Sequence, residues 1–177
     1  MTSLLRRGLS ALTLTLCLTG TAGATGVQDF VGRYAYEGSA AEKQAVNAAV
    51  ERAAMEFNPI FRLVARPRLE HAAEVYQHLL FVSAGGGLGI QKDSFPMRTC
   101  RLDGMPIHFT NDGKATTMSR HLSGSTLVEV SSTEDGTRTM TFQPEAGGKD
   151  LMVSVKVESK NLKHPLEYTV TYHRVGK

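Results

Sequence analysis

The chain has 177 residues, of which 41% are hydrophobic and 21% charged, with a formal net charge of +3. That length suits a single domain with a substantial hydrophobic core. The mild, mixed charge and the lack of a recognised motif argue against nucleic-acid binding, so no nucleic-acid partner is expected.

Residues 1–24 resemble a secretory signal peptide. Arg6 and Arg7 form a positive start, an apolar run covers 9–18, and the small residues at 22–24 offer a cleavage site. The apolar run is too short to span a membrane. We therefore expect export, to a bacterial periplasm, with secretion as the alternative.

Removal of this leader would leave residues 25–177 as one domain. It would keep a single cysteine, Cys100, and so could form no internal disulfide. Its stability would then have to come from packing.

The first predicted strand covers 30–36, and a helical pair follows it. Ser39 and Glu42 fit a capping box at the start of the first helix. Pro59 is expected to end this helix or to begin a second one. Pro67 is expected to kink or divide the second piece.

Beyond the helical pair, glycine turns separate short segments in which apolar residues alternate with polar ones. Alternation between tight turns is typical of an antiparallel meander that closes into a barrel. The nine expected strands lie at 76–82, 88–92, 95–101, 105–110, 114–122, 126–133, 137–143, 150–158 and 166–175. The sequence therefore predicts a mainly β fold: an antiparallel up-and-down barrel of about ten strands, with the helical pair inserted after the first strand.

This order of elements resembles the fatty-acid-binding proteins of the calycin superfamily. Residues 29–34 are similar to that family's opening strand, 127–137 to its late strand and acidic-glycine turn, and 151–157 and 168–174 to its last two strands. The lipocalins share the barrel and the exported setting but lack a helical pair after the first strand. The resemblance implies a calycin-like barrel that carries a small apolar ligand beneath a helical lid.

Three features depart from the family. The family is cytoplasmic, and the helical insert at 39–73 is longer here. Its carboxylate-binding arginine, two residues before a tyrosine on the last strand, would fall at Val170, although Tyr172 matches the tyrosine. The headgroup clamp of the family is therefore not carried over.

The inward face of the strands should supply any ligand contacts. A pocket of this kind would be mostly hydrophobic with few polar anchors. The candidate ligand-binding residues are Phe109, Met118, Arg120, Val130, Met140, Phe142, Val155, Tyr168 and Tyr172. The same residues could simply fill a packed barrel, and the sequence does not separate the two interpretations.

Arg120 shares strand parity with apolar neighbours and is expected to point inward. A buried arginine needs a partner, and the anionic head of a ligand is one hypothesis. An internal acid, or a bulge that turns the side chain outward, is the alternative. Glu129 is expected to be a poor partner, because Val128 and Val130 should occupy the inward face of its strand.

Arg62, Arg66 and Arg68 form a basic run on the second helical piece. Such a run is either a solvated face or a portal that contacts anionic lipid headgroups transiently.

The sequence shows no catalytic motif, and its histidines lack metal-ligand spacing, so no enzyme activity, metal or cofactor is expected. The leading hypothesis is an exported, non-enzymatic barrel that binds a small hydrophobic ligand, lipid- or fatty-acid-like. The alternative is a structural or protein-interaction module of the cell envelope whose barrel is solid. The sequence does not indicate whether the protein is a monomer or an oligomer.

Overall fold

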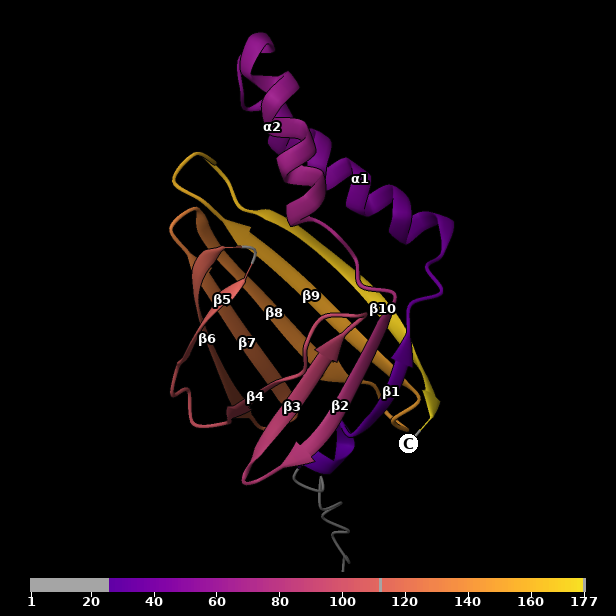
Figure 1. Cartoon of the computed structure of the whole chain (residues 1–177). Coiled ribbons are helices and arrows are strands. Elements are labelled where there is room, and N and C mark those ends of the chain that lie inside the picture. Colours follow the sequence, from indigo (N-terminus) through magenta and orange to yellow (C-terminus); the bar gives the residue numbers. More distant parts are fainter. Residues whose placement is uncertain (1–25, 112, 177) are drawn as a thin grey trace, which may run out of the picture.

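The computed structural model describes residues 26–111 and 113–176, and the predicted leader falls outside this part of the chain. One sheet of ten antiparallel strands curls into a nearly closed barrel, with two helices inserted after the first strand (Figure 1). The elements are η1 (Val27–Asp29), β1 (Gly32–Ala35), α1 (Ala40–Met55), α2 (Pro59–Ala72), β2 (His78–Ala84), β3 (Gly87–Lys92), β4 (Arg98–Arg101), β5 (Ile107–Asn111), β6 (Lys114–Ser123), β7 (Thr126–Thr133), β8 (Gly136–Pro144), β9 (Asp150–Glu158) and β10 (Leu166–Gly176). The predicted fold is confirmed.

The strands are paired in the order β4-β3-β2-β1-β10-β9-β8-β7-β6-β5. The first and last strands are therefore neighbours, and the sheet is open only between β4 and β5. The segment after β4 partly spans this opening. The Gly104 N–H donates to the Arg120 carbonyl (2.9 Å), and the Leu122 N–H donates to the Leu102 carbonyl (3.3 Å).

The two helices begin where local chemistry favours a start. At α1, the Glu42 N–H donates to Ser39 Oγ (3.1 Å) and the Ser39 N–H donates to Glu42 Oε2 (3.2 Å), which is the predicted capping box. At α2, Asn58 caps the helix and Pro59 occupies the first turn. The helix continues through Pro67, so the expected division there is wrong. Among the described residues, no helix is both long and apolar enough to cross a membrane.

Both ends of α1 are attached to β10 or to the turn before it. Near its start, Glu42 Oε1 accepts a hydrogen bond from the Thr171 N–H (2.7 Å). At its end, Glu56 accepts bonds from the Lys163 N–H (2.8 Å) and the His164 side chain (2.7 Å). The bond from His164 is the main reason that the pKa of Glu56 lies below its ordinary value. The helix is therefore fixed along β10.

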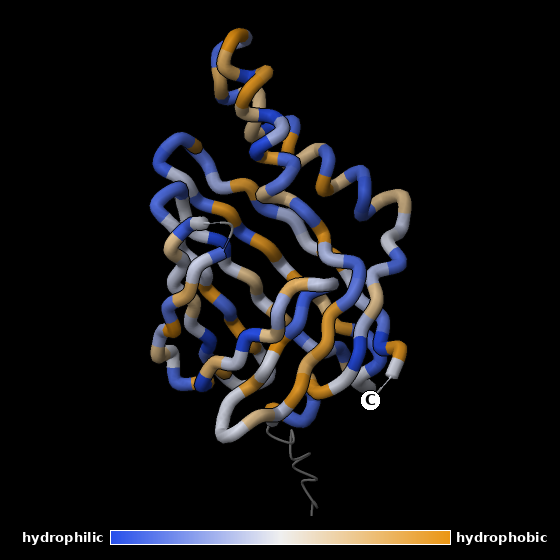
Figure 2. The backbone as a smooth tube through the Cα atoms, viewed as in Figure 1, coloured by the Kyte–Doolittle hydropathy of each residue, from blue (hydrophilic) through white to orange (hydrophobic). Residues whose placement is uncertain are grey.

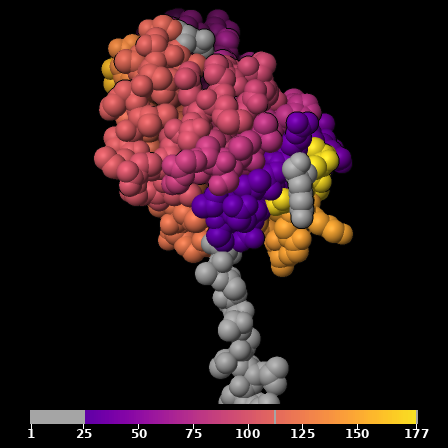
Figure 3. Space-filling model, turned by 60° about the horizontal axis from the view of Figure 1, so that its bottom comes forward, coloured from indigo at the N-terminus to yellow at the C-terminus, as the bar shows by residue number. Residues whose placement is uncertain are grey.

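One end of the barrel, here called the closed end, is sealed by aromatic side chains. Phe30, Phe81 and Phe142 have no exposed surface, and the Phe81 and Phe142 rings meet edge to face at 5.4 Å. The N-terminal segment that contains η1 lies across this end (Figure 3). Arg174 of β10 donates to the carbonyls of Val31 (2.7 Å) and Asp29 (2.6 Å) and thereby holds that segment in place.

Candidate functional site

A row of cross-strand partners crosses the middle of the barrel. Arg120, Glu129, Met140, Val155 and Tyr168 are successive partners on β6, β7, β8, β9 and β10. All five are buried, with at most 7% of their surface exposed. Residues directly opposite each other in a sheet share a face, so this row lines the interior.

The structure corrects the predicted parity of β7. Leu127 and Glu129 are buried and face inward, whereas Val128 and Val130 are only half-buried and face outward. A shift of one residue moves every side chain of a strand to the other face. Val130 is therefore not an interior ligand contact, and the prediction that Glu129 is a poor partner for Arg120 is wrong.

Arg120 uses its whole guanidinium group for contacts within the protein. Its Nε donates to Glu129 Oε2 (2.7 Å), and Nη2 lies at the same distance from that oxygen. Its Nη1 donates to the carbonyls of Leu88 and Arg98, both at 2.7 Å. The internal-acid alternative is thus confirmed. Because these carbonyls belong to β3 and β4, Arg120 connects the two sides of the opening in the sheet, and we assign it a structural role.

Lys92 is the second cation on Glu129. Its Nζ donates to Glu129 Oε1 and to the sulfur of Met140 (3.4 Å), and it lies 5.3 Å from the centre of the Tyr76 ring. Burial alone would raise the pKa of Glu129. The charges and hydrogen bonds of Lys92 and Arg120 outweigh burial and lower that pKa to about 2. Glu129 is therefore a carboxylate at neutral pH.

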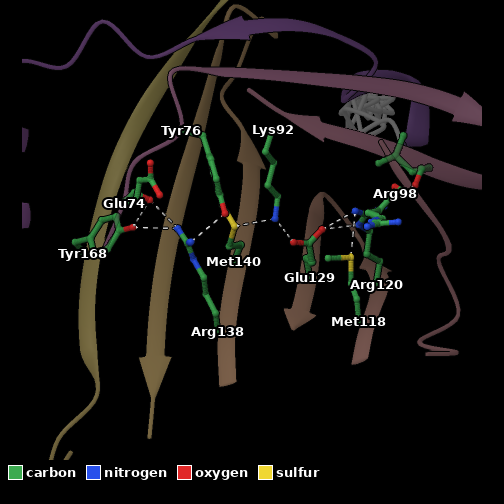
Figure 4. Close-up of polar contacts among 11 residues, drawn as sticks. Glu74, Tyr76, Lys92, Arg98, Met118, Arg120, Glu129, Arg138, Met140 and Tyr168 are labelled. Atoms are coloured by element: carbon green, nitrogen blue, oxygen red, sulfur yellow. Dashed lines mark hydrogen bonds and ion pairs between the residues drawn. The ribbon is translucent and has the colours of Figure 1, made fainter. Parts of the chain in front are cut away.

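Arg138 extends this polar network toward the helices (Figure 4). Its Nη1 donates to the Tyr76 hydroxyl (3.1 Å), and its Nη2 donates to the Glu74 carbonyl (3.0 Å) and the Tyr168 hydroxyl (3.3 Å). Its Nε is buried and has no acceptor among the described residues. The sequence analysis did not identify Arg138, although it shares the parity of Met140 on the same strand.

The other predicted ligand-binding residues occupy different environments. Met118 and Phe142 are buried in the core. Tyr172 is also buried, which raises its pKa, and its hydroxyl donates to the Tyr76 carbonyl (2.8 Å). Phe109 is half-buried, and the Arg98 guanidinium lies 4.3 Å from the centre of its ring. Whether any of them contacts a ligand stays a prediction.

The end of the interior near the helices, here called the helical end, is less sealed. Inward-facing Ile107, Ser131 and Val157 are half-buried there, as is Arg138. At the closed end, inward-facing Leu127, Phe142 and Val153 have no exposed surface. Two hollows among the described residues are open depressions, one around Thr139 and Thr141 and one around Arg33 and His78.

The three predicted portal arginines differ in their surroundings. Arg66 pairs with Glu51 and with Glu70 (3.1 Å), so its charge is balanced. Arg62 donates to the Phe57 carbonyl (3.3 Å). Arg68 is exposed and lies near the turn between β7 and β8. The pKa of Asp135 in that turn is lowered mainly by Lys114 and to a smaller extent by the charge of Arg68.

Hydrophobic residues gather at the end of α1 and in the first half of α2 (Figure 2), and their side chains are exposed to solvent. Ile60 and Leu63 are 79% and 80% exposed. This surface, here called the α2 tip, consists of Met55, Ile60, Phe61, Leu63 and Val64. Large apolar side chains gathered in this way mark a contact surface more often than single exposed ones do.

Among the described residues, no group of three or more histidine, cysteine or acidic side chains is arranged to hold a metal ion. The one cysteine among the described residues, Cys100, is buried, and burial raises the pKa of its thiol. A buried thiol of this kind is a poor nucleophile.

No protein-family model matches the chain, and no curated protein matches it by sequence. Solved structures do resemble it. Secretory abundant heat soluble protein 4 from Ramazzottius varieornatus has a TM-score of 0.54 at 13% identity, over 85% of this chain and 97% of that one. Fatty-acid-binding protein 1 of Echinococcus granulosus has a TM-score of 0.50 at 14% identity, over 84% and 98%.

A third structure, the REP1-NXSQ fatty acid transporter, has a TM-score of 0.53 at 14% identity, over 84% of this chain and 97% of that one. Identities this low show the fold and not the ligand. The protein therefore has the barrel fold of these structures, at low sequence identity.

Proposed function

We propose that this protein is an exported, non-enzymatic binding protein that holds a small hydrophobic molecule, lipid- or fatty-acid-like, at the helical end of its barrel. The observation that carries the proposal is the difference in burial between the two ends. At the helical end, inward-facing Ile107, Val157 and Arg138 keep accessible surface, so apolar groups lie there with a cation. A site for an amphiphile needs this mixture of mainly apolar lining and few polar anchors. The names of two similar structures, a fatty-acid-binding protein and a fatty acid transporter, agree with it.

Access to such a site would depend on α2 rather than on α1. Hydrogen bonds through Glu42 and Glu56 fix α1 at both ends. Only the last turn of α2 is buried, at Leu69, and the helix ends just before the buried Ala73. We infer that a ligand enters between α2 and the turn that joins β7 to β8.

The first experiment measures uptake of phenylnaphthylamine, a neutral apolar fluorescent probe, together with native mass spectrometry of protein purified from its own host. We expect one probe per chain and a copurifying small lipid. Val157→Trp should fill the helical end and abolish uptake. Val175→Trp adds the same side chain at an exposed position and should leave uptake unchanged. Uptake that survives Val157→Trp, or no uptake at all, would contradict the proposal.

The α2 tip supplies the proposed membrane contact. An apolar helix surface flanked by Arg62 and Arg68 suits a bilayer with anionic headgroups. We expect the protein to sediment with vesicles that contain phosphatidylglycerol and to bind pure phosphatidylcholine vesicles less. The double substitution Ile60→Ser and Leu63→Ser should remove this binding without affecting probe uptake. Vesicle binding that is unchanged by the double substitution would place the contact elsewhere.

The α2 tip also supports the second candidate function, a protein-interaction module with a solid barrel. A folded domain that exposes Ile60 and Leu63 to this extent either touches a membrane or meets another protein. Light scattering after gel filtration separates the two. Self-association that is lost in Leu63→Ser, combined with no probe uptake, would favour the interaction module.

A further inference from the structure

We infer that the ligand of this barrel carries an anionic head group, a carboxylate, sulfate or phosphate, and that Arg138 binds it. This inference rests on the proposed function and names the chemical class of its ligand. It starts from the charges inside the barrel. Lys92 and Arg120 share Glu129, and Tyr76 connects Lys92 to Arg138. Glu129 is the only carboxylate of this network among the described residues.

The one carboxylate is already committed. Its Oε1 accepts from Lys92 and its Oε2 accepts from Arg120, so each oxygen has a cation. A buried charge is stable only when it is paired and hydrogen-bonded. Arg138 therefore lacks the counter-ion that Arg120 has.

The neighbours of Arg138 provide acceptors but no charge. The Tyr76 and Tyr168 hydroxyls and the Glu74 carbonyl are all neutral, and burial raises the pKa of Tyr168, which keeps its phenol protonated. The Glu74 carboxylate is half-exposed and lies 3.7 Å from the His71 ring. No carboxylate of the described residues lies within ion-pair distance of the Arg138 guanidinium.

Arg138 also keeps a donor for a further acceptor. Its Nε has no partner among the described residues, and the planar guanidinium presents donors in a fork that matches an oxyanion. The half-buried Val157, the cross-strand partner of Arg138 on β9, offers apolar contact beside it. An oxyanion with an apolar body attached meets both chemical requirements at one place.

This position differs from the one that the family resemblance would suggest. There the headgroup arginine would lie on the last strand, at Val170, which is buried near the closed end. Arg138 lies on β8 at the helical end. The head of the ligand would therefore stay near the entrance and not at the bottom of the barrel.

The test compares two probes with the same ring skeleton, anilinonaphthalene sulfonate and the neutral phenylnaphthylamine. The wild-type protein should bind the sulfonate more tightly. Arg138→Met should weaken sulfonate binding roughly tenfold to a hundredfold, the range for one charge-assisted hydrogen-bonded contact, and should change neutral-probe binding little. Arg138→Lys keeps the charge and loses the planar fork of donors. Its affinity for the sulfonate should lie between those of the wild-type protein and Arg138→Met. Arg33→Met, which removes a charge from the exposed face of β1, is the matched control and should affect neither probe.

The outcomes distinguish a failure of the proposed function from a failure of the inference about the anionic head group. If the wild-type protein binds neither probe, the proposed function fails. If it binds the neutral probe and Arg138→Met weakens the binding of both probes alike or of neither, the proposed function stands and the anionic head is wrong.

Competition by inorganic phosphate is the third measurement. Phosphate that competes weakly with the sulfonate supports an anionic head on a larger ligand, whereas phosphate that binds as tightly as the sulfonate identifies a free oxyanion and overturns the inference. Circular dichroism checks each variant for folding, and phosphate competition on the wild-type protein tests the site without any substitution.

Discussion

The middle of the barrel and its helical end place the same kind of residue under opposite conditions. In the middle, beside the opening in the sheet, Arg120 meets a carboxylate and two main-chain carbonyls and is fully buried. At the helical end, Arg138 donates hydrogen bonds only to neutral oxygens, and its cross-strand partners Ser131 and Val157 keep accessible surface. A satisfied buried charge specifies and stabilises a fold, whereas an unbalanced one is typical of a site that awaits a partner. The surroundings of Arg120 therefore hold the fold together, whereas those of Arg138 are where a ligand could bind.

The largest expected effect is on the two arginines themselves. Arg120→Met should lower the free energy of unfolding by about 3–5 kcal/mol, because it breaks a buried ion pair and leaves Glu129 with one cation. Arg138→Met should cost less, about 1–3 kcal/mol, because it leaves neutral oxygens but no carboxylate without a partner. Urea unfolding of both variants measures the difference. Equal losses would mean that the two arginines have the same structural role.

The second comparison uses the two phenylalanines at opposite ends. Phe142→Ala removes a fully buried ring and should cost about 3–5 kcal/mol of unfolding free energy. Phe109→Ala removes a half-buried ring and should cost at least about 2 kcal/mol less, because less apolar surface returns to water. Thermal and urea unfolding of the pair provide the check. If Phe109→Ala proves equally costly, the helical end is as tightly packed as the closed end.

The third comparison concerns how the stability of the fold depends on pH. The pKa of Glu129 is lowered to about 2 in the folded protein, against roughly 4.3 for a glutamate in an unfolded chain. A group with a lowered folded pKa stabilises the fold above its unfolded pKa and loses that contribution as the pH falls through the folded value. We expect stability to decrease between about pH 4.3 and pH 2. Glu129→Gln should be less stable at neutral pH and should lose less stability over that interval, whereas Glu167→Gln on the exposed face of β10 should follow the wild-type curve.

The smallest expected effect is local. Glu56→Gln weakens the attachment of α1 to the turn before β10, since a neutral amide accepts hydrogen bonds from Lys163 and His164 less strongly than a carboxylate. Amide hydrogen exchange should become faster in the last turns of α1 and stay unchanged in β7 and β8. Faster exchange throughout the barrel would instead indicate a global loss of stability.

Local patterns were sufficient to predict most of the fold. The glycine turns and the alternation between them predict all ten strands, and the Ser39 and Glu42 pair predicts the start of α1, because each signal acts within a few residues. The division expected at Pro67 is wrong, since α2 continues through it. Tertiary context decides such cases.

The candidate site was harder to predict because its partners are distant in sequence. Val128 and Val130 suggested the wrong inward face for β7, since an apolar residue is the usual interior choice. The inward Glu129 is stabilised by Lys92, 37 residues away, and Arg120 reaches a carbonyl 32 residues away. Arg138 could have been found by extending the parity of Met140 by two residues, which the alternation rule allows.

The bond between Glu42 and Thr171 joins residues that are 129 positions apart. It links the N-terminal helix to the final strand, which is also the last part of the domain to be synthesised. Until β10 is present, Glu42 can cap its own helix but has no strand amide to accept from, and α1 has no surface to lie on. The helical pair is therefore made early and docked late, and a chain shortened before Thr171 would leave α1 without its support on β10. Assembly of this domain is complete only when its first helix and its last strand meet.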